Sequence, residues 1–137
     1  MRPRGARWAL VLGVAAAIGG AAAACFSDRN GGVTALSASC QAKAKAASVA
    51  EGAVVVGIEN FSFKPTVTTI PRGKTVTWIN CESTAGLGHT VTSDAGGQLA
   101  STLILPGQTY TKTFTGPGTY AYHCEPHPTM KGQVVVE

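Results

Sequence analysis

The segment Gly118–Gly132, with the sequence GTYAYHCEPHPTMKG, constrains this chain more than any other part of it. It places Cys124, His127 and Met130 within seven residues, at the spacing C-x2-H-x2-M. A thiol, an imidazole and a thioether make a soft, mixed ligand set, and a His2Cys site with a weak axial Met is the copper arrangement used for electron transfer. His89, in the segment GLGHTV, is the best candidate for the second histidine. The sequence therefore predicts one copper site with these four side chains as ligands.

Short strands are predicted throughout residues 53–137. Runs of β-branched residues cover 66–70 and 75–80, and the turn signal PRGK joins them. Further strand patterns are found at 54–59, 89–93, 109–115, 119–124 and 133–136. About seven or eight short strands at regular spacing predict an all-β fold, a Greek-key β-sandwich. We expect its core to contain the large side chains Phe61, Phe63, Trp78, Phe114, Tyr120 and Tyr122.

The first 24 residues are predicted to be a signal peptide, because a basic start is followed by an apolar stretch rich in Ala and Gly. An uncleaved membrane anchor is the alternative, since the apolar stretch is at the short edge of what spans a bilayer. Either interpretation predicts an exported protein, in the periplasm or on the outer face of the membrane. The leader ends in AAAC, which resembles a bacterial lipoprotein box with Cys25 as the lipidated residue. Ordinary cleavage followed by an incidental cysteine is the other interpretation.

Residues 25–52 read as a linker, because they are rich in Ala, Ser, Gly and Lys and have no hydrophobic period. A short helix at 41–47 is compatible with the helix-forming residues there. We therefore divide the chain into a signal peptide (1–24), a linker (25–52) and a β domain (53–137). Cys40 and Cys81 either form a disulfide, which an exported protein permits, or remain two unpaired thiols.

Four segments resemble the cupredoxins, the small blue-copper proteins, and especially their amicyanin-like members. They are VAEGAVVV (49–56), TVTWIN (75–80), GTYAYHCEPHPTMKG (118–132) and QVVVE (133–137). The resemblance implies a cupredoxin-like sandwich with one type 1 copper held by His89, Cys124, His127 and Met130. It also implies that Asn80, outside the ligand set, connects the His89 loop to the cysteine loop by hydrogen bonds. Two departures are the longer segment between Asn80 and His89, and Thr90 where Asn is usual.

The same resemblance implies a one-electron carrier that cycles between Cu(I) and Cu(II) and acts as a monomer. Its partners would be an amine dehydrogenase as electron donor and a c-type cytochrome as acceptor. We expect an apolar docking surface around His127, formed by Pro126, Pro128, Leu87 and Leu99. The alternative is a periplasmic copper carrier or storage protein that uses the same ligands.

Composition argues against other functions. The chain has three histidines, which are too few for the second metal centre that a copper enzyme such as a nitrite reductase needs, so we expect no enzymatic activity. Structural zinc is disfavoured because zinc prefers Cys, His and carboxylate ligands over Met. The net charge is +4, but the range 53–137 holds five basic and five acidic residues. A neutral domain without a basic stripe is not expected to bind nucleic acid.

Overall fold

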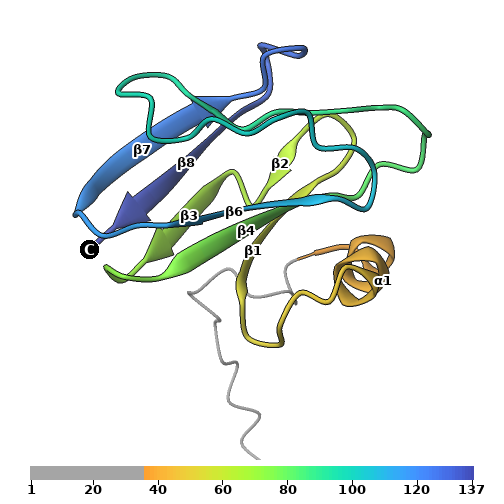
Figure 1. The fold of residues 1–137 in the computed structure, drawn as a ribbon, viewed down its shortest axis with the longest axis horizontal. Coiled ribbons are helices and arrows are strands. Elements are labelled where there is room, and N and C mark those ends of the chain that lie inside the picture. Colours follow the sequence, from red (N-terminus) through yellow and green to blue (C-terminus); the bar gives the residue numbers. More distant parts are fainter. Residues whose placement is uncertain (1–35) are drawn as a thin grey trace, which may run out of the picture.

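The computed structural model describes residues 36–137, which form a two-sheet β-sandwich with one helix on its outside (Figure 1). The elements, in chain order, are α1 (Ala38–Ala46), β1 (Val54–Ile58), β2 (Phe63–Lys64), β3 (Val67–Ile70), β4 (Thr75–Asn80), β5 (Thr92–Ser93), β6 (Thr109–Thr113), β7 (Gly118–His123) and β8 (Lys131–Val136). The predicted signal peptide and the predicted lipidation of Cys25 concern residues outside the described range. Within the described range, no helix has the length and apolar character needed to cross a membrane.

Each sheet has four strands, in the orders β2-β1-β4-β6 and β3-β8-β7-β5. β1 pairs in parallel with β4, and β3 pairs in parallel with β8, while the remaining pairs are antiparallel. β8 alternates exposed or half-buried residues with buried ones, as expected for a strand with one face on a core. The eight strands confirm the predicted all-β sandwich.

Aromatic side chains fill the space between the sheets. The Trp78 ring lies 5.6 Å from Tyr110 and 5.5 Å from Tyr122, so one residue of β4 contacts both its own sheet and the opposite one. Tyr122 packs over Gly132, its partner on β8; a Cβ atom at Gly132 would lie 2.6 Å from the tyrosine ring. Burial raises the pKa of Tyr122 to about 12, and within residues 36–137 its hydroxyl has no hydrogen-bond partner of normal geometry. This packing fixes β7 two residues before Cys124.

Phe61 is not part of the core, and the prediction that placed it there is wrong. Its side chain is 50% exposed, because it lies in the turn between β1 and β2 rather than on a strand. Asn60 and Phe61 have φ angles of 50° and 54°, the positive values that a two-residue hairpin turn requires at both central positions. Asn tolerates this conformation, whereas Phe does so at a cost that other contacts must offset.

Helix α1 lies within the range that we predicted as a linker. Ser37 caps its N-terminus by accepting a hydrogen bond from the backbone N–H of Cys40 at 3.2 Å. The helix covers the outer face of the first sheet with a second apolar cluster, formed by Leu36, Cys40, Ala44, Val55, Ile79 and Cys81. A disulfide joins Cys40 to Cys81, so of the two interpretations of these cysteines the structure has the bonded one. The domain boundary at residue 53 stays a prediction.

Candidate metal centre

The loop from Cys124 to Met130 is built from two successive tight turns. The backbone N–H of His127 donates to the carbonyl of Cys124 at 3.2 Å, and the N–H of Met130 donates to the carbonyl of His127 at 2.9 Å. The N–H of Cys124 in turn donates to the carbonyl of Met130 at 3.1 Å and closes the loop. The spacing C-x2-H-x2-M thus places Cys124 at the start of the first turn, His127 where the first turn ends and the second begins, and Met130 at the end of the second.

His89 reaches the same end of the sandwich from a different part of the chain. Its backbone forms an isolated bridge with Ile104, through hydrogen bonds of 3.1 Å and 2.8 Å. Asn80 holds the surrounding segments: its amide nitrogen donates to the carbonyls of Leu87 and Ile104, both at 2.8 Å. Its amide oxygen accepts from the backbone N–H of Glu82 at 2.9 Å. Asn80 therefore fixes the loop that carries His89, from a position that is fully buried.

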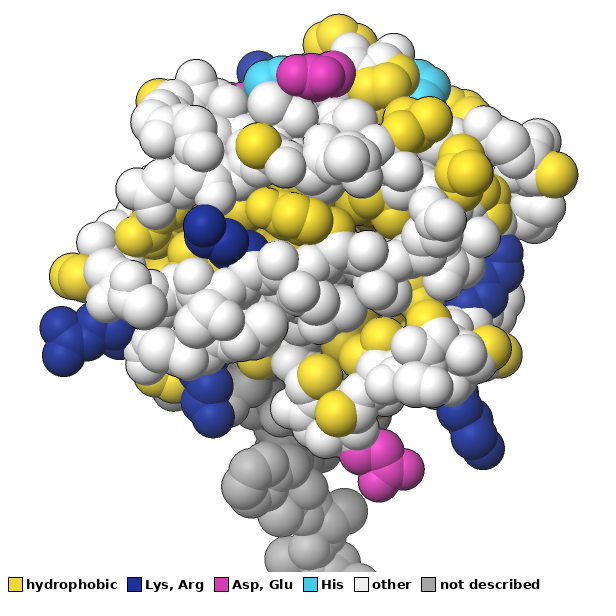
Figure 2. Space-filling model, in the orientation of Figure 1, with side chains coloured by type: hydrophobic (Ala, Val, Ile, Leu, Met, Phe, Trp, Pro, Cys, Tyr) yellow, Lys and Arg dark blue, Asp and Glu magenta, His cyan; other side chains and the backbone are white. Residues whose placement is uncertain are grey.

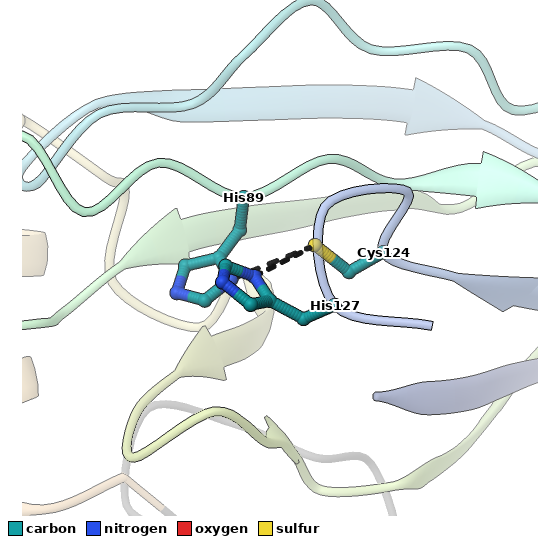
Figure 3. Close-up of side chains that lie close together, drawn as sticks. All are labelled: His89, Cys124 and His127. Atoms are coloured by element: carbon teal, nitrogen blue, oxygen red, sulfur yellow. Dashed lines mark hydrogen bonds between the residues drawn. The ribbon is translucent and has the colours of Figure 1, made fainter. Parts of the chain in front are cut away.

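Three of the four predicted ligand residues have donor atoms that face one another (Figure 3). The Cys124 Sγ lies 3.6 Å from the Nδ1 of His89 and 3.5 Å from the Nδ1 of His127. All three donor atoms lie within 4.8 Å of one another, a spacing compatible with a metal ion. Met130 is buried and belongs to the same apolar cluster as Cys124. The geometry therefore suits a single ion held by two imidazoles and a thiolate. The thioether of the fourth predicted ligand, Met130, follows three residues after His127 in the chain.

The two histidines differ in their surroundings. His89 is fully buried, whereas His127 is half-buried and reaches the surface. Burial lowers the pKa of His89, and the neighbouring His127 lowers it further, while Glu82 opposes both effects. The neutral imidazole that a metal ion requires is thus the form favoured at His89.

Thr90 connects the two ligand loops. Its backbone N–H donates to the Cys124 Sγ at 3.4 Å, and its hydroxyl accepts from the backbone N–H of Glu125 at 2.9 Å. We expected Asn80 to make this connection, but its side-chain hydrogen bonds all lie on the His89 side. The reason is topological: residue 90 follows His89 directly and lies beside the cysteine loop, whereas Asn80 faces the segments around residues 87 and 104.

Two further residues of the centre were not found from the sequence. The carboxylate of Glu82 lies 3.4 Å from the Nε2 of His89 and accepts a hydrogen bond from the backbone N–H of Phe61 at 2.9 Å. The Phe61 ring meets the rings of His127 and His89 edge-on, at centroid distances of 4.9 Å and 5.8 Å. These contacts offset the cost of the positive φ at Phe61. No local pattern in the sequence indicates either role.

The third histidine is separate from the cluster. The Nδ1 of His123 lies 2.5 Å from a carboxylate oxygen of Asp94, on the opposite face of β7 from Cys124. The other residue group with metal-ligand spacing in the described part of the chain is Cys40, Glu59 and Cys81, and its two cysteines are joined in the disulfide. The described residues therefore offer one centre suited to a metal ion.

Replacing Thr90 with valine should weaken this centre. The hydrogen bond from the Glu125 N–H to the Thr90 hydroxyl is lost, while the backbone contact to the Cys124 Sγ remains, so we expect the free energy of unfolding to fall by about 1 kcal/mol. Because such supporting groups orient metal ligands, we also expect an affinity for copper lower by about 10-fold. Chemical denaturation and copper titration measure the two effects. Thr90→Ser is the matched control, since it keeps the hydroxyl; equal behaviour of both variants would contradict the role assigned to this group.

Comparison with known proteins identifies what this arrangement is similar to. Residues 50–137 match the family described as copper binding proteins, plastocyanin/azurin family. Amicyanin of Paracoccus denitrificans is 44% identical over 93 residues, which are 67% of this chain and 71% of the relative. Plastocyanin of Scenedesmus fuscus is 38% identical over 87 residues, which are 55% of this chain and 86% of the relative. The crystal structure of amicyanin from Paracoccus versutus superimposes with a TM-score of 0.60 at 38% identity, covering 67% of this chain and 88% of that one.

Proposed function

This chain belongs to the plastocyanin/azurin family of copper-binding proteins, and from that premise we propose that it is a one-electron carrier with His89, Cys124, His127 and Met130 as copper ligands. The observation that carries the proposal is the convergence of two imidazole nitrogens on one buried thiol at the end of the sandwich. Copper is the cofactor, and when bound it supplies a Cu(I)/Cu(II) couple.

The donor atoms fit copper in kind and in setting. Thiolate and imidazole are soft and intermediate ligands, and the thioether of Met130 is typical of copper rather than of zinc. The Cys124 Sγ also accepts a hydrogen bond from the backbone N–H of Thr90, which fixes the position of the sulfur beside the His89 loop. Burial of His89, Cys124 and Met130 keeps water away from this side of the site.

The surrounding residues hold the ligands in a fixed geometry. The two turns of the 124–130 loop, the bridge at His89 and the hydrogen bonds of Asn80 are all made by protein groups alone. Pro126 and Pro128 further restrict the backbone on both sides of His127. A site that keeps one geometry in both oxidation states reorganises little when an electron moves, and this favours electron transfer over metal exchange.

His127 is the ligand through which a partner would approach, because its ring is half-buried at the surface. Phe61 lies against it, and Pro126 and Pro128 are exposed on either side. Leu99, which we predicted in this docking surface, is buried, so that part of the prediction is wrong. On the face in Figure 2, apolar side chains gather beside a histidine at the upper right, while Lys and Arg are scattered. A small apolar surface suits a weak, transient redox encounter.

We place the protein among carriers rather than enzymes, because the cluster uses two of its three histidines and His123 pairs with Asp94. An amine dehydrogenase and a c-type cytochrome are the partners that the resemblance suggests. Export to the periplasm, anchoring through lipid on Cys25 and a monomeric state likewise stay predictions.

Copper loading of the metal-free protein tests the proposal. We expect intense visible absorption from the thiolate–Cu(II) bond, one copper per chain, and a reversible one-electron response in voltammetry. Competition with a copper chelator separates electron carrier from copper carrier: an electron carrier should retain its copper over many redox cycles. Rapid loss of copper to the chelator in both oxidation states would favour the copper carrier or storage function. His123→Gln is the control, because it alters a histidine outside the cluster and should change neither result.

A further inference from the structure

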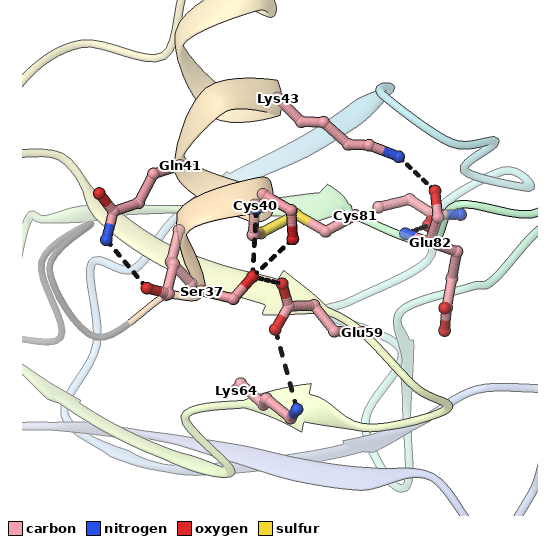
Figure 4. Close-up of a disulfide and its surroundings, with 11 residues drawn as sticks. Ser37, Cys40, Gln41, Lys43, Glu59, Lys64, Cys81 and Glu82 are labelled. Carbon is pink, nitrogen blue, oxygen red and sulfur yellow. Dashed lines mark hydrogen bonds and ion pairs between the residues drawn. A yellow bond between two sulfur atoms is a disulfide. The ribbon is translucent and has the colours of Figure 1, made fainter.

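Helix α1 is attached to the segment that leads from β4 to His89. It lies outside residues 50–137, the range that matches the family, and packs on the outer face of the first sheet (Figure 1). The disulfide from Cys40 holds Cys81, and the Lys43 ammonium donates a hydrogen bond to the backbone carbonyl of Glu82 (Figure 4). Two consecutive residues at the end of β4 are therefore fixed by α1.

At the N-terminus of α1, the capping residue Ser37 is hydrogen-bonded to the carboxylate of Glu59, the residue that follows β1. Glu59 is itself 3.8 Å from the Lys64 ammonium on β2. The helix is thus connected to both strands that frame the turn of Phe61, as well as to the end of β4. These contacts and the disulfide give α1 one position on the sheet.

Glu82 connects helix α1 to the metal centre. Its backbone N–H donates to Asn80 and its carbonyl accepts from Lys43, so its main chain is held on both sides. Its carboxylate points toward the centre, with one oxygen 2.9 Å from the Phe61 N–H and 3.4 Å from the His89 Nε2. Glu82 and His89 are both buried, at 7% and 0% exposure. Among the described residues, the Nε2 of His89 has no hydrogen-bond partner of normal geometry, and the Glu82 carboxylate at 3.4 Å is an acceptor within reach of it.

The position of this carboxylate matters for a histidine that binds through Nδ1. The proton of such an imidazole resides on Nε2, and a carboxylate that accepts it fixes the ring orientation and increases the donor strength of Nδ1. The negative charge also favours the more positive oxidation state of the metal. A main-chain displacement at Glu82 would weaken both effects without touching any ligand.

We propose that α1 and its disulfide form a positioning device for His89 that acts through Glu82, and that the thiol–disulfide state of Cys40 and Cys81 is thereby transmitted to the copper site. The inference rests on the proposed function of the four ligands. With the disulfide closed, Glu82 is held against the imidazole. Reduction by a dithiol donor breaks the S–S bond: the donor supplies two electrons and two protons, becomes a disulfide itself, and leaves two thiols. The end of β4 is then held by fewer contacts.

Copper-loaded variants test this inference through the reduction potential, the visible spectrum and the affinity for Cu(II). For Cys40→Ala/Cys81→Ala we expect the thiolate–Cu(II) absorption to remain, the potential to rise, and the Kd for Cu(II) to increase by about 10-fold. Val136→Ala is the matched control: it also loses buried apolar contact, but at the end of β8 that pairs with Gly118, remote from Cys124. It should lower the melting temperature and leave the potential unchanged. A cysteine variant that behaves like Val136→Ala would overturn the inference.

A double-mutant cycle with Glu82→Gln tests the route. Glu82→Gln alone should raise the potential more than loss of the disulfide does. If the disulfide acts through Glu82, removing it in the Glu82→Gln background should shift the potential little further. Full additivity would overturn the assigned route. Lys43→Met keeps the disulfide and removes the hydrogen bond to the Glu82 carbonyl. It should raise the potential by less than loss of the disulfide does. This variant serves in place of the cysteine variant if the cysteine variant does not fold.

A measurement on the metal-free protein tests this inference independently of the proposed function. In the metal-free protein, nitrogen NMR of the histidine rings reports solvent exchange of the His89 Nε2 proton. Exchange should be slow in the wild type and faster in Cys40→Ala/Cys81→Ala and in Glu82→Gln. A wild type with no reversible couple would overturn the proposed function alone, whereas equal exchange rates in wild type and variants would overturn the positioning by α1.

Discussion

Replacing Cys124 with serine should abolish the visible absorption of the copper-loaded protein while the sandwich remains folded. The colour of such a site arises from charge transfer between a thiolate and Cu(II), and in the described part of the chain Cys124 supplies the thiol that faces both histidines. The alcohol of serine is not deprotonated under these conditions and is a poor ligand for Cu(I). We therefore expect complete loss of the intense band and of the reversible redox response.

The fold should survive this substitution because the change is small. Burying a hydroxyl in place of a thiol costs about 1–3 kcal/mol, less than the stability of a typical domain, about 5–15 kcal/mol. Circular dichroism of the metal-free variant checks the fold, and absorption and copper analysis check the site. A Cys124→Ser protein that stays intensely coloured would show that the ligand assignment is wrong.

Replacing Asn80 with alanine should cause a large loss of stability. Three hydrogen bonds of its side chain are removed. The carbonyl of Leu87 and the N–H of Glu82 lose their side-chain partner, while the Ile104 carbonyl keeps the hydrogen bond from the His89 N–H. Each backbone group left unsatisfied costs about 1–3 kcal/mol, so we expect a total of about 2 kcal/mol or more. Chemical denaturation of the metal-free protein measures the change.

Gln41→Ala is the control for the Asn80 variant. It also removes a side-chain amide, but one that is exposed on α1 and donates a single hydrogen bond to the carbonyl of Leu36. Its effect should be within about 0.5 kcal/mol of zero. The Asn80 variant should also bind copper less tightly, because the loop that carries His89 depends on these bonds. If both variants had equal stability, the hydrogen bonds of Asn80 would not hold this end of the sandwich.

Much of the fold and the kind of metal centre could be predicted from the sequence. Strand alternation is a property of neighbouring residues, so the runs around Val54–Ile58 and Thr75–Asn80 indicated strands without any knowledge of their partners. The C-x2-H-x2-M spacing is also local, because one tight turn separates each residue from the next. These features sufficed to predict the sandwich and the copper cofactor, and both predictions are confirmed by the structure and the family match.

The sequence by itself thus determined the strands, the chemistry of the donor set and the order in which the donors occur. Tertiary structure alone decided what surrounds them: Phe61 lies over the histidines instead of in the core, Thr90 connects the two ligand loops, and Glu82 faces His89. It also decided that the disulfide fixes α1 on the sheet. Each of these contacts depends on how the two sheets and the loops at their ends pack together. Local hydrophobic pattern and residue spacing do not predict such packing, because the residues involved come from separate strands and turns.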